Sequence, residues 1–299
     1  MLGPVLFIIF INPLDKAIQS HDKETLVSKY ADDTKIGRVI RDESDCASLQ
    51  HAVDNLVTWC ANNGMEVHPE KCVVVHFGRN NLRHEYKIGN NVIGDSTIVR
   101  DLGVLVAESC SFSEHVNSIA RKAHAVLSQL KRATTLRDGK TFTKLYTSYV
   151  RPLLESAAPV WNPYKREDVQ TLEKVQRRAL RMISDLGSST YEERLKKLGL
   201  QSLEDRRRRG DAIEAYKTIN GINDVDVYDW FNFVQDRHSR NTRSYENDLI
   251  VGEKTRLDIR KHFFKNRVVK EWNSLPLDIR MATSTNSFKN QYDALLLHV

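Results

Sequence analysis

The chain has 299 residues, of which 40% are hydrophobic and 28% charged, and its formal net charge is +6. This length and composition predict a globular protein of one large or two ordinary domains. They exclude a transmembrane helix, because the apolar stretch at residues 2–11 is only ten residues long. No Lys or Arg precedes that stretch and no small-residue cleavage site follows it, so we expect an intracellular protein of the cytoplasm or nucleus that is not secreted.

The four cysteines show no C-x-x-C spacing, which argues against a zinc ribbon and against a redox site. We therefore expect reduced thiols. A zinc site can be drawn from Cys60, His68, Cys72 and His76, but the irregular spacing of these residues favours core packing.

The first 40 residues predict a helix and a hairpin. Pro4 opens an apolar run that predicts a helix to about Ser20, and we expect this helix to be buried because it is apolar on nearly all sides. Residues 26–31 and 34–39 alternate in polarity on either side of Asp32-Asp33. This pattern predicts a hairpin whose turn presents two carboxylates.

A second helix is predicted at residues 46–62, where apolar residues recur at helical spacing and Asn63-Gly64 ends the pattern. Strands are predicted to follow at residues 72–77, near 85–88 and at 98–106, with turn residues between them. The first 110 residues therefore read as β-α-β.

Beyond residue 110 the apolar period becomes helical. Helices are predicted at residues 113–130, 141–154, 169–183 and 203–219, and a final one around 259–272. Between the last two, residues 224–252 are polar and rich in turn residues, which predicts a flexible or extended segment. The whole chain is expected to have an α+β fold with a mostly helical second part.

Charge is distributed unevenly along the chain. Residues 1–110 carry 11 Lys and Arg against 15 Asp and Glu, a balance of −4, whereas residues 115–215 carry 21 against 12, a balance of +9. A basic half suits a polyanion such as nucleic acid, and a solvated helical surface explains it about as well.

The Tyr30-Ala31-Asp32-Asp33 segment is the strongest candidate for chemistry. Adjacent carboxylates at a hairpin turn can hold divalent metal ions beside a phosphate, as nucleotidyl transfer by two metal ions requires. Oxygen ligands favour Mg²⁺. The alternative is that the two acids only satisfy a tight turn.

An ordered series of motifs around this segment resembles the reverse transcriptases of non-LTR retrotransposons, specifically jockey-like LINE elements. Leu2-Gly3-Pro4 with residues 7–14 is similar to the end of the motif that contacts template and incoming nucleotide, and residues 30–33 to the metal-binding motif C. Leu56-x-x-Trp59 through Asn63-Gly64-Met65 to Lys71 resembles motif D, and Asp101-Leu102-Gly103-Val104 resembles the primer-grip hairpin.

The resemblance continues into the basic half and covers nearly the whole chain. Four later segments are similar to the region after the palm and to the C-terminal region of this family, namely residues 145–155, 160–163, 172–179 and 272–276. The resemblance implies a partial polymerase palm over residues 1–110, thumb-like helices over 111–160 and a basic, mainly helical region over 161–299. The implied partners are an RNA template, a DNA primer and deoxynucleoside triphosphates.

The resemblance also assigns roles to residues. It implies that Asp32 is the principal ligand of Mg²⁺ or Mn²⁺ and Asp33 its partner, and that Gly3, Pro4 and Tyr30 contact nucleic acid. Three further positions have a competing structural interpretation. Lys71 either neutralises pyrophosphate or is a solvated charge at a strand start. Leu102-Gly103 either shapes the primer grip or forms an ordinary β-bend. Trp59 fits motif D, but it is expected to pack in the core.

In the basic half, the predicted helix at residues 169–183 exposes four cations, Lys174, Arg177, Arg178 and Arg181. These side chains either grip phosphates or form a solvated face. The run Arg206-Arg207-Arg208-Arg209 either clamps phosphate or directs nuclear import, and by itself is weak support for either function.

The chain also departs from the family. It begins after the position of the third carboxylate, in motif A, and it lacks the glutamine-glycine-serine stretch, the fingers and an N-terminal endonuclease. We therefore expect a reverse transcriptase segment that is inactive alone. The alternative is a catalytically silent nucleic-acid-binding or interaction module.

Overall fold

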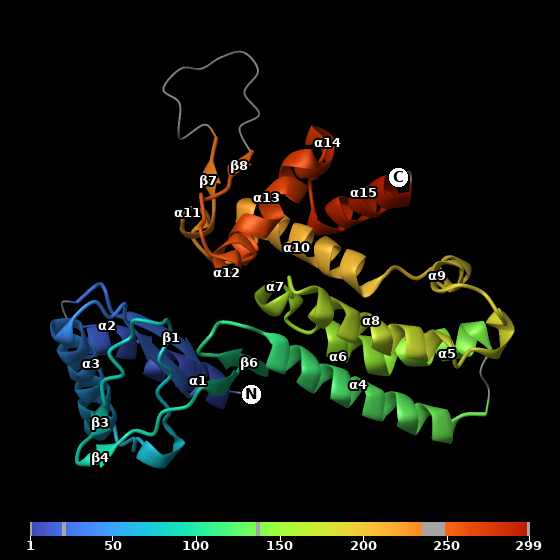
Figure 1. The fold of residues 1–299 in the computed structure, drawn as a ribbon. Coiled ribbons are helices and arrows are strands. Elements are labelled where there is room, and N and C mark those ends of the chain that lie inside the picture. The colour runs from blue at the N-terminus through green and yellow to red at the C-terminus, as the bar shows by residue number, and fades with distance from the viewer. Residues whose placement is uncertain (1, 20–21, 136–137, 235–248, 298–299) are drawn as a thin grey trace. The chain divides into compact units, whose positions relative to one another are not determined.

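The computed structural model describes residues 2–19, 22–135, 138–234 and 249–297 (Figure 1). The fold is α+β, as predicted, with helices and two-stranded antiparallel sheets. The chain divides into two compact units, Met1–Cys110 and Ser111–Val299. No helix in the described residues has both the length and the apolarity needed to cross a membrane.

The first unit begins with two short helices in place of the long one predicted. Helix α1 covers Gly3–Ile11 with Pro4 in its first turn, and α2 covers Leu14–Gln19 after the break at Asn12-Pro13. The prediction that this segment is buried was wrong, because most apolar side chains of α1 are exposed: Val5, Leu6, Ile8, Ile9 and Phe10. The helix is apolar on all sides, whereas the core of this unit covers only the side that carries Phe7 and Ile11.

Helix α3, Glu43–Asn62, is the centre of the first unit and was predicted correctly apart from its first turn. Asp42 caps it by accepting hydrogen bonds from the amides of Ser44 and Asp45, which stabilises the N-terminus. One side of α3 packs on α1 and α2 through Ala52 and Leu56. The other side packs through Leu49, Val53 and Val57 against the cluster formed by Tyr86, Ile88 and Ile93.

The strands of this unit form hairpins, and they are shorter than predicted. Strands β1 and β2, Leu26–Tyr30 and Asp33–Gly37, pair as expected. The strand predicted near 85–88 is the short β3, Lys87–Ile88, which pairs with a strand that was not predicted, β4, Asn91–Val92. The strand predicted at 98–106 is a hairpin of β5, Ile98–Asp101, and β6, Val104–Ala107. The strand predicted at 72–77 contributes only one bridge, from Val74 to Asp95.

The second unit contains every helix predicted between residues 113 and 219. They are α4 Ser113–Ala133, α5 Gly139–Leu145, α6 Arg151–Glu155, α8 Arg166–Leu180 and α10 Leu203–Ile219. A π-helical turn, η2 Tyr146–Val150, joins α5 to α6. Between the long helices lie α7 Ala158–Trp161, the 3-10 turn η3 Ser184–Leu186 and α9 Tyr191–Leu198, which has a capping box from Thr190 and Glu193. Helices α4, α6 and α8 pack together around buried side chains such as Leu127, Leu154 and Leu172.

The C-terminal part packs an aromatic cluster against α10. Helix α11, Val227–Trp230, and strands β7 and β8, Asn232–Phe233 and Ile250–Val251, occupy the segment predicted as extended, of which residues 235–248 lie outside the described residues. The final helix predicted at 259–272 is two helices, α12 Asp258–Lys261 and α13 Phe264–Ser274. The sequence analysis missed α14, Leu277–Arg280, and α15, Thr285–Leu297, which supply Ile279, Phe288 and Tyr292 to this core.

Candidate metal and nucleic-acid sites

The two adjacent acids lie on the hairpin of β1 and β2, residues 26–37, here called the Asp hairpin. Tyr30 pairs directly with Asp33, so Ala31 and Asp32 form a two-residue turn. Ala31 has a φ of 54°, a region that non-glycine residues seldom occupy. Asp33 is therefore the first residue of β2 and does not lie in the turn itself. The side chains of Tyr30, Asp32 and Asp33 are all exposed, which leaves both carboxylates accessible to an ion.

A second two-residue turn lies at the tip of the β5–β6 hairpin. Asp101 pairs with Val104, and Leu102 and Gly103 have φ values of 43° and 88°. Positive φ at both central positions suits the right-handed twist of the flanking strands, and glycine adopts it without a steric penalty. Leu102 is 54% exposed, so its side chain is not part of the core. The Leu102-Gly103 turn was predicted; its contact with a primer stays a prediction.

An ion pair holds the two hairpins together. The ammonium of Lys35, on β2, lies 2.6 Å and 2.7 Å from the two carboxylate oxygens of Asp101, at the end of β5. Both side chains are partly exposed, so the pair contributes little to stability. It links β2 of the Asp hairpin to Asp101, the residue that precedes the Leu102-Gly103 turn. Sequence reasoning missed this link because the two residues are 66 positions apart.

Lys71, the third residue predicted for catalysis, is not bonded to the Asp hairpin. Lys71 is exposed and ends the 3-10 turn η1, Pro69–Lys71, so it does not begin a strand. No hydrogen bond or ion pair in the described part of the chain joins Lys71 to either acid. Among the described residues, one set of three potential metal ligands lies close together, and it includes neither Asp32 nor Asp33. The oxygen donors of the Asp hairpin suit Mg²⁺, but they are too few to hold it tightly.

Trp59 packs as predicted. Its side chain is partly buried against the cluster of α1, α2 and α3, and its ring lies 5.7 Å from that of Phe10. Gly3 and Pro4 form the exposed first turn of α1. Their contact with nucleic acid stays a prediction.

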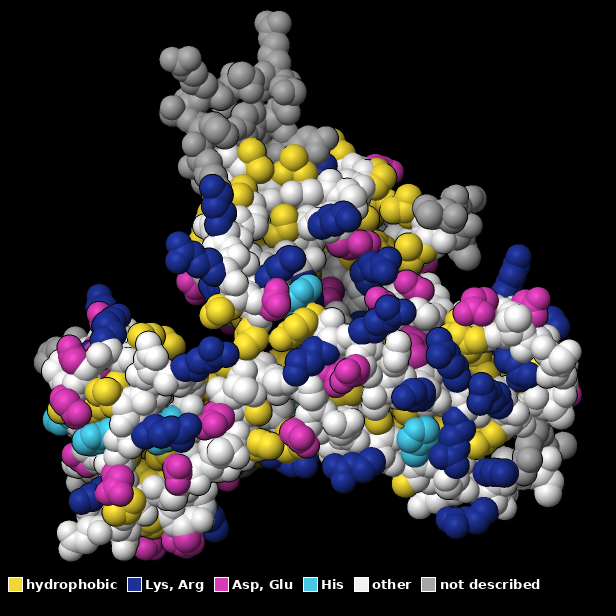
Figure 2. Space-filling view, viewed as in Figure 1, with side chains coloured by type: hydrophobic (Ala, Val, Ile, Leu, Met, Phe, Trp, Pro, Cys, Tyr) yellow, Lys and Arg dark blue, Asp and Glu magenta, His cyan; other side chains and the backbone are white. Residues whose placement is uncertain are grey.

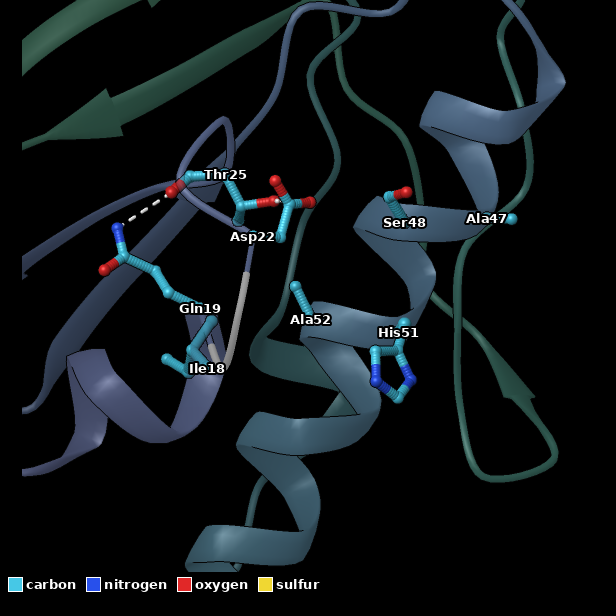
Figure 3. A pocket seen from close by; sticks show the side chains of 8 residues that line it. All are labelled: Ile18, Gln19, Asp22, Thr25, Ala47, Ser48, His51 and Ala52. Carbon is cyan, nitrogen blue, oxygen red and sulfur yellow. Dashed lines mark hydrogen bonds between the residues drawn. The ribbon is translucent and has the colours of Figure 1, made fainter.

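A shallow pocket of about 300 Å³ lies between α2 and α3 (Figure 3). Gln19, Asp22 and Thr25 line it from one side, and Ser48 and His51 from α3. The Gln19 amide donates to the backbone oxygen of Thr25 at 2.9 Å, and the Thr25 hydroxyl donates to Asp22. Because these polar groups bond to one another, the pocket offers a ligand few free partners.

The basic face of α8 has the predicted arrangement. Lys174, Arg177, Arg178 and Arg181 are exposed, while Leu172, Val175, Ala179 and Ile183 are buried. Figure 2 shows Lys and Arg side chains gathered over α4, α5 and α8 on the viewed face. We call Lys174, Arg177, Arg178 and Arg181 the α8 face. Its contact with phosphates stays a prediction.

Two of these arginines contact other side chains. The Arg178 guanidinium lies 3.3 Å from Nδ1 of His124 on α4, and the Arg177 guanidinium lies over the Tyr191 ring, 4.9 Å from its centre. Burial and then the charge of Arg178 lower the pKa of His124. Both causes disfavour the charged form of His124, so the positive charge of this surface comes from the Lys and Arg side chains.

The four consecutive arginines of α10 do not form a basic patch. Successive helical residues point about 100° apart, so each side chain meets a different neighbour. Three of them bond to groups on other elements: Arg206 to Glu155, Arg207 to Asn162 and Arg209 to Asp293. Arg207 is only 2% exposed. These contacts serve the packing of the unit, and they count against a phosphate clamp or an import signal formed by those three residues.

Sequence reasoning missed a cationic groove on α5 and η2. Lys140, Lys144 and Tyr149 line a depression of about 310 Å³, and Tyr149 is 61% exposed. The two lysines are four residues apart and therefore lie on one face of the helix. The spacing of the two lysines was present in the sequence, but the exposure of Tyr149 beside them is decided by the packing of the unit.

Parts of the chain are similar to known proteins. The family described as "Reverse transcriptase (RNA-dependent DNA polymerase)" matches residues 1–122. The chain is 23% identical over 202 residues to "Probable RNA-directed DNA polymerase from transposon BS" of Drosophila melanogaster, an alignment that covers 62% of this chain and 22% of that protein. It is 27% identical over 112 residues to an uncharacterized protein of Caenorhabditis elegans, covering 36% of this chain and 57% of that protein.

No solved structure matches the chain. The matched residues 1–122 include both the Asp hairpin and the Leu102-Gly103 turn. The predicted resemblance to non-LTR retrotransposon reverse transcriptases is therefore confirmed, and it is carried by the match of residues 1–122 to the reverse transcriptase family and by the similarity to the transposon polymerase.

Proposed function

We propose that this chain is the later part of an RNA-directed DNA polymerase and that its 299 residues do not polymerise alone. The observation that carries this proposal is the Asp hairpin, which exposes two adjacent carboxylates inside the segment matched by the reverse transcriptase family. The chain spans only 22% of the transposon polymerase that it resembles, so the activity of the whole protein is inferred from family membership.

The proposed chemistry assigns each residue a task. Asp32 and Asp33 hold divalent metal ions, which activate the primer 3′-hydroxyl and stabilise the departing pyrophosphate when they are bound. Tyr30 and the Leu102-Gly103 turn position the primer end beside these carboxylates, and the Lys35–Asp101 ion pair links the two hairpins that carry them. Lys71, which is exposed, is proposed to neutralise the pyrophosphate.

The incomplete ligand set explains the proposed inactivity. No third carboxylate lies with Asp32 and Asp33 among the described residues, and an octahedral ion requires further fixed ligands. Without them the primer hydroxyl is not held in line with the α-phosphate. Positioning of this kind contributes about 7 to 11 kcal/mol to catalysis, so its loss is enough to abolish detectable extension.

Primer extension tests this proposal directly. The 299-residue chain would be assayed on an RNA template with Mg²⁺ and with Mn²⁺, alone and then joined to the upstream polymerase segment of a related transposon protein. Extension is expected only in the joined protein and is expected to disappear in Asp32→Ala. Glu85→Ala is the matched control, because Glu85 is an exposed acid outside the Asp hairpin and outside the segments that resemble polymerase motifs. Robust extension by the chain alone would overturn the proposal.

The second candidate function is nucleic-acid binding without catalysis. It is favoured by the α8 face, whose four cations are exposed in a region with a balance of +9. Under this alternative, the joined protein does not extend a primer, and the chain still binds RNA or DNA in a salt-dependent way.

A further inference from the structure

Three side chains of different chemistry meet at the start of α3. They are Glu43 and Cys46, in the first turn of that helix, and His84, from the segment before β3. Their ligand atoms, a carboxylate oxygen, a thiol sulfur and an imidazole nitrogen, all lie within 4.8 Å of one another. Nδ1 of His84 is 3.7 Å from a carboxylate oxygen of Glu43.

The fold positions all three residues. Glu43 and Cys46 are three residues apart and therefore lie on the same side of the helix. The chain before His84 is fixed at Arg83, whose φ is 50°, whose amide donates to the Asn81 side chain, and whose guanidinium bonds to Glu108.

The interior side of the cluster is also ordered. The ring of His84 packs edge-on against Tyr86, with 5.1 Å between their centres. Tyr86 is 4% exposed and Cys46 is 1% exposed, so the sulfur lies at the edge of the core while the other two ligands reach solvent. A site with one buried and two accessible ligands allows an ion to enter.

We propose that Glu43, Cys46 and His84 bind a Zn²⁺ ion and leave its fourth position to water. A thiolate, an imidazole and a carboxylate are the ligand types that zinc takes in proteins, whereas Mg²⁺ prefers oxygen alone. Bond lengths of about 2.0 to 2.3 Å place the ligand atoms of a tetrahedral zinc site roughly 3.5 Å apart. Closing the cluster from 4.8 Å needs a movement of about 1 Å, which rotation of the accessible Glu43 and His84 side chains supplies.

Zinc here would connect the start of α3 to the segment before β3. The thiol proton of Cys46 leaves on binding, so affinity is expected to rise with pH. The N-terminus of α3 carries a partial positive charge, which disfavours a nearby cation. The Asp42 carboxylate accepts hydrogen bonds from the amides of Ser44 and Asp45 and so offsets this charge. This site is independent of the Asp hairpin and of the proposed polymerase function.

The test is zinc titration of the full chain, reduced and freed of metal, against a chromogenic zinc indicator with Mg²⁺ in excess. One equivalent is expected to bind with micromolar or tighter affinity. His84→Ala should weaken binding by about a hundredfold, since even changes to the partners of zinc ligands cost about 10- to 100-fold, and Glu43→Gln by about tenfold. Both side chains reach solvent, so these variants should keep the fold, which circular dichroism would verify.

Co²⁺ substitution identifies the sulfur ligand. The parent chain with Co²⁺ should show thiolate-to-cobalt charge-transfer absorption, and Cys46→Ser should lose it. His68→Ala and Cys72→Ser are the matched controls, because both residues belong to the same unit but not to the cluster, and both should bind zinc as the parent does. Absence of a stoichiometric site would overturn the proposal. Unchanged affinity in His84→Ala and Glu43→Gln, or loss in the two controls, would overturn it as well.

Discussion

The α8 face makes a quantitative prediction about nucleic-acid binding. Lys174 and Arg181 are both exposed, and no described side chain forms a hydrogen bond or ion pair with either. They are therefore the cations of this face that are freest to meet a phosphate. Changing both, as Lys174→Gln with Arg181→Gln, should remove two phosphate contacts without disturbing Arg177 and Arg178, which pack on neighbouring side chains.

The size of the effect follows from counterion release. Each neutralised phosphate contributes about 0.9 to the slope of log affinity against log salt on duplex DNA. Two lost contacts should therefore reduce the magnitude of the slope by about 1.8. Raising the salt from 50 to 200 mM lowers the affinity of both proteins, and the factor of this loss should be roughly twelve times smaller for the double variant than for the parent chain.

Fluorescence anisotropy with a labelled duplex, measured over this salt range, would give both slopes. The matched control is Arg208→Gln with Lys217→Gln, which also removes two positive charges from the second unit. Each of these cations already faces an acid, at 3.7 Å from Asp205 and 3.4 Å from Glu214. An equal fall in slope for the control would show that overall charge, and not the α8 face, drives binding. An unchanged slope in the test variant would also refute the argument.

Three further predictions concern stability, protonation and metal affinity. Arg267→Met should lower the free energy of unfolding by about 3 to 5 kcal/mol, because it leaves the nearly buried Asp211 without its bidentate partner. The control Arg208→Met should lower it by less than about 0.5 kcal/mol. Urea unfolding followed by tryptophan fluorescence compares the two variants. The pKa of His124 should lie below its ordinary value and rise in Arg178→Gln, which NMR titration would measure. Because the imidazole of His124 takes up a proton more readily in the unfolded chain, the stability of the fold should decrease as the pH falls below about 6.5. The Asp hairpin should bind Mg²⁺ only in the millimolar range or weaker, and a tight site seen by calorimetry and lost when both acids become Asn would contradict this.

The sequence by itself determined the elements whose signals are local. Helix α3 follows from apolar residues at helical spacing between Asp42 and Gly64, and its ends were predictable within a few residues. The hairpin of β1 and β2 follows from alternation on both sides of a two-residue turn. The exposed cations of α8 follow from the same periodicity that buries Leu172 and Val175. The family resemblance also depended only on the order and spacing of short motifs.

Other features depended on contacts between residues far apart in the chain. A run of four arginines reads as a basic patch, yet the fold supplies Glu155 and Asp293 as partners for Arg206 and Arg209. A helix that is apolar on all sides predicts burial, yet α1 has too few neighbours within its own unit to be covered.

The zinc ligands show the same limit. The sequence offered Cys60, His68, Cys72 and His76 as a set, whereas the fold brings Cys46 to His84, 38 positions away in the chain. Periodicity determines which face of an element is apolar, because it reflects the geometry of one helix or strand. Which residue of another element meets that face depends on how the elements pack, and only the tertiary structure decides it.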